Sequence, residues 1–224
     1  LKKQGVEFLS EPYGTPGNRF VFMRDPDGIY LKLEESPIPK PAGARDQTQI
    51  MGMPYIGINV SDVEASVSFY RRFGYRSVRW INEQTLSPEE SAAWGFDQPV
   101  RYRGADVAIE RGDHHRLRLL QWIEPFDPDP AYPPPINPQG INRLALTVPD
   151  VERAVKILEA QGVPFLSEVA PCCSGTNTDT GGIVHAIDPD GVFLELVGNL
   201  EPRPVAPQPK HCPPLVIRYP ESPL

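Results

Sequence analysis

The chain contains internal repeats, and they constrain its fold more than any other feature of the sequence. Residues 1–11 read LKKQGVEFLSE and residues 158–168 read LEAQGVPFLSE, so eight of the eleven positions are identical. Each copy is followed by a loop containing glycine, an apolar run and a D-P-D-G tetrapeptide. A second match aligns residues 60–74 with residues 148–162, with six identical positions out of fifteen and no gap. The chain therefore repeats one supersecondary unit.

Each repeat predicts a strand followed by a helix and further strands. Short apolar runs have the alternation of strands, and each D-P-D-G turn suits a hairpin between the last two strands. The strands are expected at residues 55–60, 75–81, 100–110 and 116–123 in one copy, and at 143–148, 164–168, 183–187 and 192–197 in the other.

The helix boundaries can be read from polar residues and glycines. Asp62 and Asp150 stand where a carboxylate accepts hydrogen bonds from the first N–H groups of a helix. Gly74 and Gly162 suit a left-handed cap at the other end. Ser87, followed by Pro-Glu-Glu, predicts a further short helix ending near residue 94. That helix is either a lid over a cavity or a simple insertion.

The repeats also give the expected domain organisation. Leu1 aligns with Leu158, which lies inside a predicted helix, so the first copy lacks a strand and half of its helix. Residues are therefore expected to precede Leu1 in the native protein. The expected parts are a partial βαβββ unit at 1–36, a linker at 37–52, a two-unit domain at 53–200 (units 53–125 and 138–200) and a proline-rich tail at 201–224.

Composition excludes several classes of protein. The formal net charge of −7 disfavours nucleic-acid binding, which needs clustered Lys and Arg. No apolar run reaches the roughly 20 residues of a membrane span. Three cysteines do not suggest a disulfide framework, so a cytoplasmic protein is expected. The expected partner is a small molecule, with no nucleic acid and no membrane, and a homodimer is left open.

The pattern V-x-D-V-E-x-x-V/S-x-F-Y at residues 60–70, together with D-P-D-G-x-x-L-E-L at 188–196, resembles the glyoxalase / bleomycin-resistance / extradiol-dioxygenase superfamily (vicinal oxygen chelate fold). The resemblance covers nearly all of residues 1–200. It implies an α+β fold in which βαβββ units pair into a cupped, eight-stranded mixed sheet around a cavity, with the helices outside. Many members hold one divalent metal through His or Gln on the first strand and Glu on the last strand of each unit.

Most of the family's metal-ligand positions are changed here. Glu195 matches the glutamate of the last strand. Tyr55 and Arg143 stand where His or Gln is expected, and Arg118 and Lys32 stand where glutamate is expected. An arginine offers no lone pair to a metal. No cofactor is therefore predicted, and a bound divalent metal is the alternative.

Strand alternation places these side chains on faces that line the cavity in the family. Members that bind small anions carry a polar group ten residues before the last glutamate, which here is His185. The predicted catalytic residues are His185, Glu195 and Tyr55, and the predicted substrate-binding residues are Arg118, Arg143, Asn59, Trp122 and Phe193.

Each of these residues also has a purely structural interpretation. Arg143 and Glu195 could form a salt bridge that replaces the metal. Arg118 has no evident acid, so it either anchors an anionic ligand on the face shared with Arg143 or lies at the surface. His185 is an acid–base group or a packed strand histidine. Tyr55 is a cavity wall or an acid–base group.

The leading functional interpretation is an enzyme of the lyase, isomerase or dioxygenase-like kind, acting without the family metal on a small anionic aromatic or acyl compound. The alternative is a non-catalytic module that sequesters or senses such a compound. The fold does not decide between them, because function depends on the site.

Overall fold

The structure, a computed structural model, describes residues 1–35, 50, 52–110, 115–128, 140–172 and 181–200. The expected linker (except Ile50 and Gly52) and the proline-rich tail lie outside these residues.

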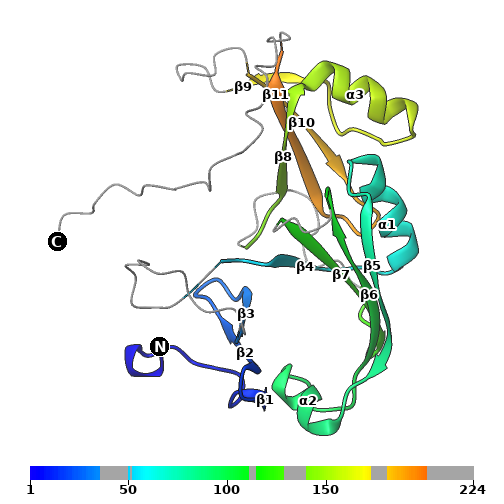
Figure 1. Ribbon diagram of the computed structural model, residues 1–224. Helices are drawn as coiled ribbons and strands as arrows, with labels where there is room; N and C mark the ends of the chain where they lie inside the picture. The colour runs from blue at the N-terminus through cyan, green and yellow to red at the C-terminus, as the bar shows by residue number, and fades with distance from the viewer. Residues whose placement is uncertain (36–49, 51, 111–114, 129–139, 173–180, 201–224) are drawn as a thin grey trace, which may run out of the picture.

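The strands form three sheets (Figure 1). The first has the order β1-β2-β3, with β1 (Tyr13–Thr15), β2 (Asn18–Arg24) and β3 (Tyr30–Glu34). The second has the order β4-β7-β6-β5, with β4 (Tyr55–Asn59), β5 (Ser77–Thr85), β6 (Arg101–Ala108) and β7 (Arg116–Glu124). The third has the order β8-β11-β10-β9, with β8 (Leu144–Asp150), β9 (Ala170–Cys172), β10 (Gly181–Ile187) and β11 (Phe193–Asn199).

The α+β fold class is confirmed. Each whole unit supplies a four-stranded mixed sheet, in which the first and last strands are parallel and the other pairs are antiparallel. The strand expected at 164–168 is reduced to an isolated bridge between Phe165 and Ala186. Pro164 has no N–H to donate to a ladder, and β9 pairs with β10 instead.

The predicted helix boundaries are confirmed for α1 (Val63–Arg72), α2 (Pro88–Ala93) and α3 (Val151–Ala160). Asp62 and Asp150 each accept a hydrogen bond from the backbone N–H three residues later, at 2.9 Å. Ser87 does the same for α2 at 3.1 Å. Gly74 and Gly162 have φ angles of 95° and 78°, which a residue with a side chain rarely adopts. A short 3₁₀ helix, η1 (Lys2–Gln4), lies near the N-terminus, and none of the described helices is long and apolar enough to cross a membrane.

The two whole units share one hydrophobic core. Val67 and Leu119 of the first unit belong to the same buried cluster as Leu158 and Leu196 of the second. Helices α1 and α3 lie on the same outer side of their sheets (Figure 1). This packing joins the units through their apolar faces.

The D-P-D-G turn of the second unit docks on helix α1. Asp190 accepts hydrogen bonds from the backbone N–H of Ser61 at 2.8 Å and from the hydroxyl of Ser66 at 3.2 Å. The buried Tyr70 hydroxyl donates to Asp188 at 2.9 Å. Burial raises the pKa of the Asp188 carboxyl despite these hydrogen bonds. The repeated turn therefore also holds the two units together.

The partial unit lies opposite the concave side of the β4–β7 sheet (Figure 1). The Tyr55 hydroxyl donates to Glu34 on β3 at 3.2 Å. Phe20 and Phe22 on β2 contact Trp94 at the end of α2, with ring centroids 6.0 and 5.2 Å apart. The sheet of the first whole unit is thus covered by residues 1–35.

Candidate functional site

Glu195 is the centre of a compact polar group on the third sheet. Its Oε2 lies 3.0 Å from Nε2 of His185 and 2.9 Å from Nε of Arg143. His185 and Glu195 are paired across β10 and β11. The Glu195 side chain is only 12% exposed, so it needs these partners. The predicted ion pair between Arg143 and Glu195 is present, and the carboxylate also fixes the imidazole of His185.

A cavity of about 410 Å³ opens beside this group. A cavity of this size is suited to a small molecule. Leu166 and Phe193 supply apolar walls, whereas the polar wall consists of the three groups just described. The predicted residues Arg143, His185, Phe193 and Glu195 therefore meet in one place. We call them, with Leu166, the Glu195 cavity.

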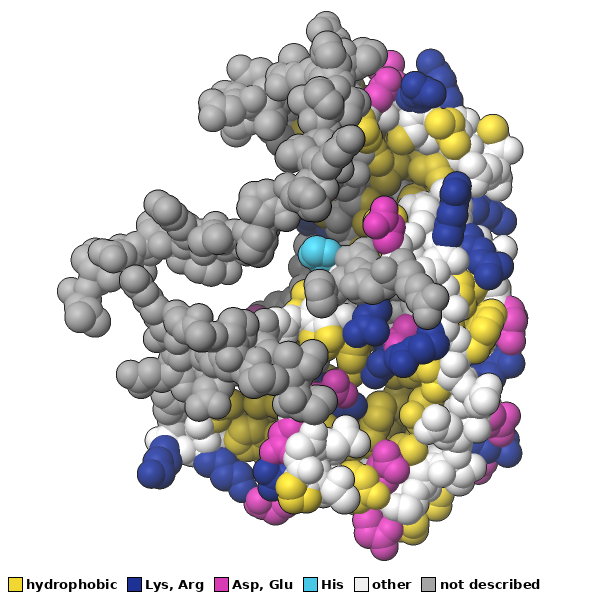
Figure 2. All heavy atoms as spheres, in the orientation of Figure 1, with side chains coloured by type: hydrophobic (Ala, Val, Ile, Leu, Met, Phe, Trp, Pro, Cys, Tyr) yellow, Lys and Arg dark blue, Asp and Glu magenta, His cyan; other side chains and the backbone are white. Residues whose placement is uncertain are grey.

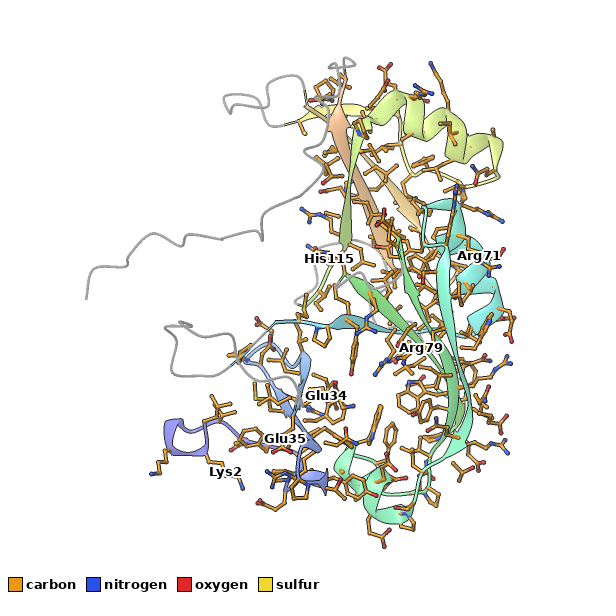
Figure 3. The ribbon with its side chains drawn as sticks, in the orientation of Figure 1. Lys2, Glu34, Glu35, Arg71, Arg79 and His115 are labelled. Carbon is orange, nitrogen blue, oxygen red and sulfur yellow. The ribbon has the colours of Figure 1, made fainter. Side chains whose placement is uncertain are left out.

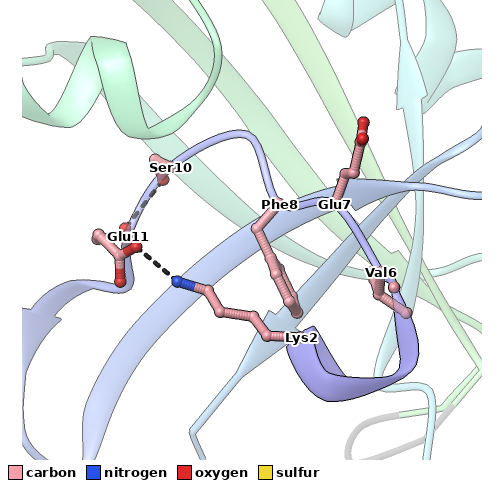
Figure 4. A pocket seen from close by; sticks show the side chains of 7 residues that line it. Lys2, Val6, Glu7, Phe8, Ser10 and Glu11 are labelled. Atoms are coloured by element: carbon pink, nitrogen blue, oxygen red, sulfur yellow. Dashed lines mark hydrogen bonds and ion pairs between the residues drawn. The ribbon is translucent and has the colours of Figure 1, made fainter.

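A second hollow, of about 560 Å³, lies in the N-terminal loop (Figure 4). Its lining residues fall between Lys2 and Glu11 and include none of the predicted site residues. An ion pair between Lys2 and Glu11 crosses it, and both side chains are largely exposed. This hollow is an open surface feature without an acid–base pair, and no function is assigned to it.

Arg118 forms the centre of another polar group, on the second sheet. Its guanidinium donates to both oxygens of Asp106, at 2.7 and 3.1 Å, and lies 3.9 Å from the ring centre of Tyr55. Arg79 also pairs with Asp106, which is only 3% exposed. The prediction that Arg118 has no acid was wrong. Asp106 is its direct cross-strand partner, and a lone carboxylate in the apolar run GADVAI was the signal that could have revealed it.

The environment of this second group shifts the pKa values of its aspartate and its tyrosine in opposite directions. Burial acts to raise the pKa of Asp106, but the hydrogen bonds from Arg118 and Arg79 outweigh it and hold the pKa below its usual value. Burial raises the pKa of Tyr55 to about 12, against the opposing effect of Arg118. Tyr55 is therefore a protonated hydrogen-bond donor near neutral pH.

The predicted site residues fall into two groups. Tyr55, Asn59, Arg118 and Trp122 lie on β4 and β7, where the Trp122 indole donates to Asn59 at 2.9 Å. None of these four lines the Glu195 cavity. The expectation that Arg118 and Arg143 face one cavity fails because the partial unit covers the Arg118 face. The sequence did not indicate which unit would pack over the face of the β4–β7 sheet that carries Arg118.

The two groups nevertheless occupy equivalent places in the two repeats. Asp106 and Arg118 are cross-strand partners on the last two strands of one sheet, as His185 and Glu195 are in the other. The sequence alignment of the repeats likewise places Tyr55 opposite Arg143. A carboxylate–guanidinium pair in one unit thus corresponds to an imidazole–carboxylate pair in the other.

A family model described as the Glyoxalase/Bleomycin resistance protein/Dioxygenase superfamily matches residues 52–196. The chain belongs to this superfamily. It is 29% identical over 162 residues to a lactoylglutathione lyase of Schizosaccharomyces pombe, a match covering 66% of this chain and 48% of that protein. The chain thus spans about half the length of that relative.

Solved structures of superfamily members have the same fold. A glyoxalase family protein from Bacillus cereus matches with a TM-score of 0.52 and 20% identity, over 71% of this chain and all of that one. A V278E mutant of glyoxalase I from Zea mays matches with a TM-score of 0.51 and 20% identity, over 88% of this chain and 61% of that one. At these identities the likeness concerns the fold.

The side chains here do not fit the divalent metal that the superfamily implies. Tyr55, Arg118 and Arg143 stand at three of the four ligand positions of the two whole units, and Lys32 stands at one in the partial unit. Glu195 already contacts a guanidinium and an imidazole. Within the described ranges, no group of three or more His, Cys, Asp or Glu side chains could hold a metal ion.

We expect protein purified without chelator to carry no stoichiometric divalent metal at these positions. The physical reason is that guanidinium groups repel a cation and cannot donate a lone pair to it. Elemental analysis by plasma mass spectrometry measures the metal content directly. One equivalent of zinc, iron, manganese or nickel that disappears in Glu195→Gln would contradict the expectation.

Proposed function

We propose that this chain is a metal-independent lyase or isomerase that moves a proton on a small anionic acyl or aromatic compound bound in the Glu195 cavity. The observation that carries the proposal is the 3.0 Å contact between His185 Nε2 and Glu195 Oε2 on the cavity wall. An imidazole oriented by a carboxylate is the usual arrangement of a general base.

Each polar residue has a defined role in this proposal. His185 takes a proton from the substrate and returns it at another atom. Glu195 is a positioning residue, which holds the ring and stabilises the imidazolium that forms. Arg143 binds the substrate anion. Its guanidinium has five N–H donors, whereas the contacts to Glu195 and to Asn142 use only two nitrogens.

The similarity to the lactoylglutathione lyase supports the proposal that this chain is a lyase. It makes lactoylglutathione, an acyl compound with carboxylate groups, the first compound to test. Lactate and mandelate extend the test to a small acyl and an aromatic acid. In all three, the proton on the carbon next to the carbonyl is the one that an acid–base enzyme would move.

The test measures solvent proton exchange in heavy water by NMR, with EDTA present throughout. Wild-type protein is expected to introduce deuterium next to the carbonyl of at least one of these compounds. His185→Gln should slow exchange by about 100-fold or more, whereas His115→Gln, which changes an exposed histidine outside the cavity lining, should leave the rate unchanged. Absence of exchange with all three compounds, or an exchange rate in His185→Gln close to that of the wild type, would overturn the proposal.

The alternative function is a non-catalytic binding module. The ion pair between Arg143 and Glu195 favours it, because a mutually neutralised pair can simply close a binding cavity. A binding module would retain one of these compounds in equilibrium dialysis without exchanging its proton. The two functions therefore give different outcomes with the same compounds.

A further inference from the structure

We propose that helix α1 of the first whole unit positions the His185–Glu195 pair of the second unit, by holding the D-P-D-G turn that joins the two strands on which the pair lies. Ser61, Ser66 and Tyr70 are then positioning residues, which act on the reaction without contacting the substrate. The inference rests on the proposed function, since it concerns the groups to which the proton transfer is assigned.

The turn lies close to the pair along both strands. His185 stands three residues before Asp188 on β10, and Glu195 stands four residues after Gly191 on β11. At about 3.3 Å per residue of a strand, each is on the order of 10 Å from the turn. The register of the hairpin pairs His185 directly with Glu195. A tilt of the end of this hairpin would therefore move both side chains.

The neighbouring strands support little of this end of the hairpin. Within the described residues, β9 pairs with β10 at residues 181–183, and β8 pairs with β11 from residue 194 onward. Phe165 adds a single bridge to Ala186. Residues 187–193 therefore extend beyond both neighbouring strands, toward α1 (Figure 1).

The turn is fixed instead by hydrogen bonds at α1. Asp190 accepts from the backbone N–H of Ser61 at 2.8 Å and from the Ser66 hydroxyl at 3.2 Å. Asp188 accepts from the Tyr70 hydroxyl at 2.9 Å. Ser66 and Tyr70 are fully buried, and Asp188 is only 4% exposed. Hydrogen bonds to carboxylates are stronger than those between neutral groups, so these contacts hold the turn in one place.

The contacts use the inner side of α1. Its outer side is a polar surface: dark-blue side chains gather over it in Figure 2, and the exposed Arg71 is labelled there in Figure 3. Ser66 and Tyr70 are four residues apart and share the inner side with the buried Val63 and Val67. A hydroxyl among apolar side chains is costly unless it is hydrogen-bonded, and the turn supplies that partner for both hydroxyls.

The D-P-D-G turn of the partial unit shows that docking is not needed to form the turn. In both copies the first aspartate accepts from the N–H groups two and four residues later, at 2.9 and 2.8 Å. Asp27, which corresponds to Asp190, is exposed and has no side-chain hydrogen bond or ion pair within the described part of the chain. The bonds to α1 are thus additional to those of the turn, in the copy that carries the acid–base pair.

Asp190→Ala tests the inference by removing both of its bonds to the first unit while the turn keeps its own. The kcat for proton exchange should fall by about tenfold or more, because a catalytic group must lie within about 0.5 Å of its productive position. KM should change by less than about twofold, since Arg143, which binds the anion, lies outside the hairpin. Asp27→Ala is the matched control in the other copy and should leave both constants unchanged. A lower melting temperature of Asp190→Ala with an unchanged kcat, or equal losses of kcat in the two variants, would overturn the inference.

Tyr70→Phe tests the other aspartate contact, and it takes the place of Asp190→Ala if that variant does not fold. Phenylalanine keeps the buried ring but removes the hydroxyl, so kcat should again fall more than KM changes. Tyr102→Phe is the control, because Tyr102 is a buried tyrosine of the same unit whose hydroxyl donates to Gln84 at 3.3 Å. Both variants should lower the melting temperature, and only Tyr70→Phe should lower kcat. The same kcat in both would show that Tyr70 has a structural role alone and would overturn the inference.

The imidazole signals of His185 give a second measurement, which does not require turnover. In protein labelled with ¹⁵N-histidine, the NMR signals of this ring are identified by their absence in His185→Gln. Asp190→Ala should shift them, whereas Asp27→Ala should leave them in place. Unshifted signals in both Asp190→Ala and Tyr70→Phe would overturn the inference and leave the proposed function standing. Absence of proton exchange in wild-type protein would overturn the proposed function, and the signals would still decide whether α1 positions the pair.

Discussion

Asp106→Asn is expected to lower the free energy of unfolding by about 3 kcal/mol, at the lower end of the range for breaking a buried ion pair. The asparagine keeps the shape of the side chain but removes the charge that faces Arg118, whose side chain is only 20% exposed. Arg118 would then be a largely buried cation without its acid. Arg79 contributes less to this loss, since its side chain is mostly exposed.

Chemical denaturation followed by circular dichroism measures the change. Asp97→Asn is the matched control, because Asp97 is an exposed aspartate of the same unit and its replacement should change stability by less than about 0.5 kcal/mol. Similar losses in the two variants would mean that the Asp106 network contributes little to the fold.

The same variant should change how stability depends on pH. The folded pKa of Asp106 lies below its usual value, so its contribution is present above about pH 4 and is lost as the pH falls through the folded pKa. Wild-type protein should therefore lose more stability than Asp106→Asn below about pH 4. The raised pKa of Asp188 makes stability depend on pH in the opposite direction. This contribution is the same in the wild type and in Asp106→Asn, so it cancels when the two are compared. Parallel acid curves would argue against this role of Asp106.

His185→Gln is expected to reduce the catalysed exchange rate by about 100- to 10,000-fold, the usual contribution of a general acid–base group. Glutamine can still hydrogen-bond to Glu195, so the cavity should keep its shape and KM should change little. The loss should therefore appear in kcat. Steady-state kinetics with the compound that shows exchange separates the two constants.

Glu195→Gln distinguishes a positioning role from a structural one. The amide can hold the ring of His185 but cannot stabilise its protonated form. The kcat for exchange should therefore fall with little change in KM, because the imidazolium that forms loses its carboxylate partner. Arg143 would also lose its acid, so the melting temperature is measured in parallel. An unchanged kcat with a lower melting temperature would assign Glu195 to structure alone.

Local features of the fold were readable from the sequence because short-range interactions determine them. Asp62 and Asp150 cap helices through N–H groups three residues away, and Gly74 and Gly162 end them through their own backbone angles. Because the sequence repeats, a helix boundary predicted in one copy also predicts the equivalent boundary in the other. The pair of Arg143 with Glu195 followed from strand alternation and the cost of a buried charge.

The separation of the predicted site into two groups was not readable, because it depends on contacts between distant segments. Nothing in the local pattern indicated that residues 1–35 would cover the β4–β7 face. Strand alternation predicts one acid, Glu195, on the faces of Arg118 and Arg143, whereas Asp106 lies opposite Arg118 on the neighbouring strand. Alternation gives the face on which a side chain lies, but not the segment that will cover that face.

The opposite charges at equivalent positions of the two units have a consequence for assembly. A chain with repeated units can misfold by pairing a segment with the wrong copy. The β1–β3 sheet presents Lys32 and Glu34 to the phenol and guanidinium of the first unit. On the second unit Arg143 stands in the place of Tyr55 and is already paired with Glu195, so Glu34 would find no hydroxyl donor there and would meet a second carboxylate. The divergence of the two copies therefore gives each segment of this repetitive chain one preferred partner.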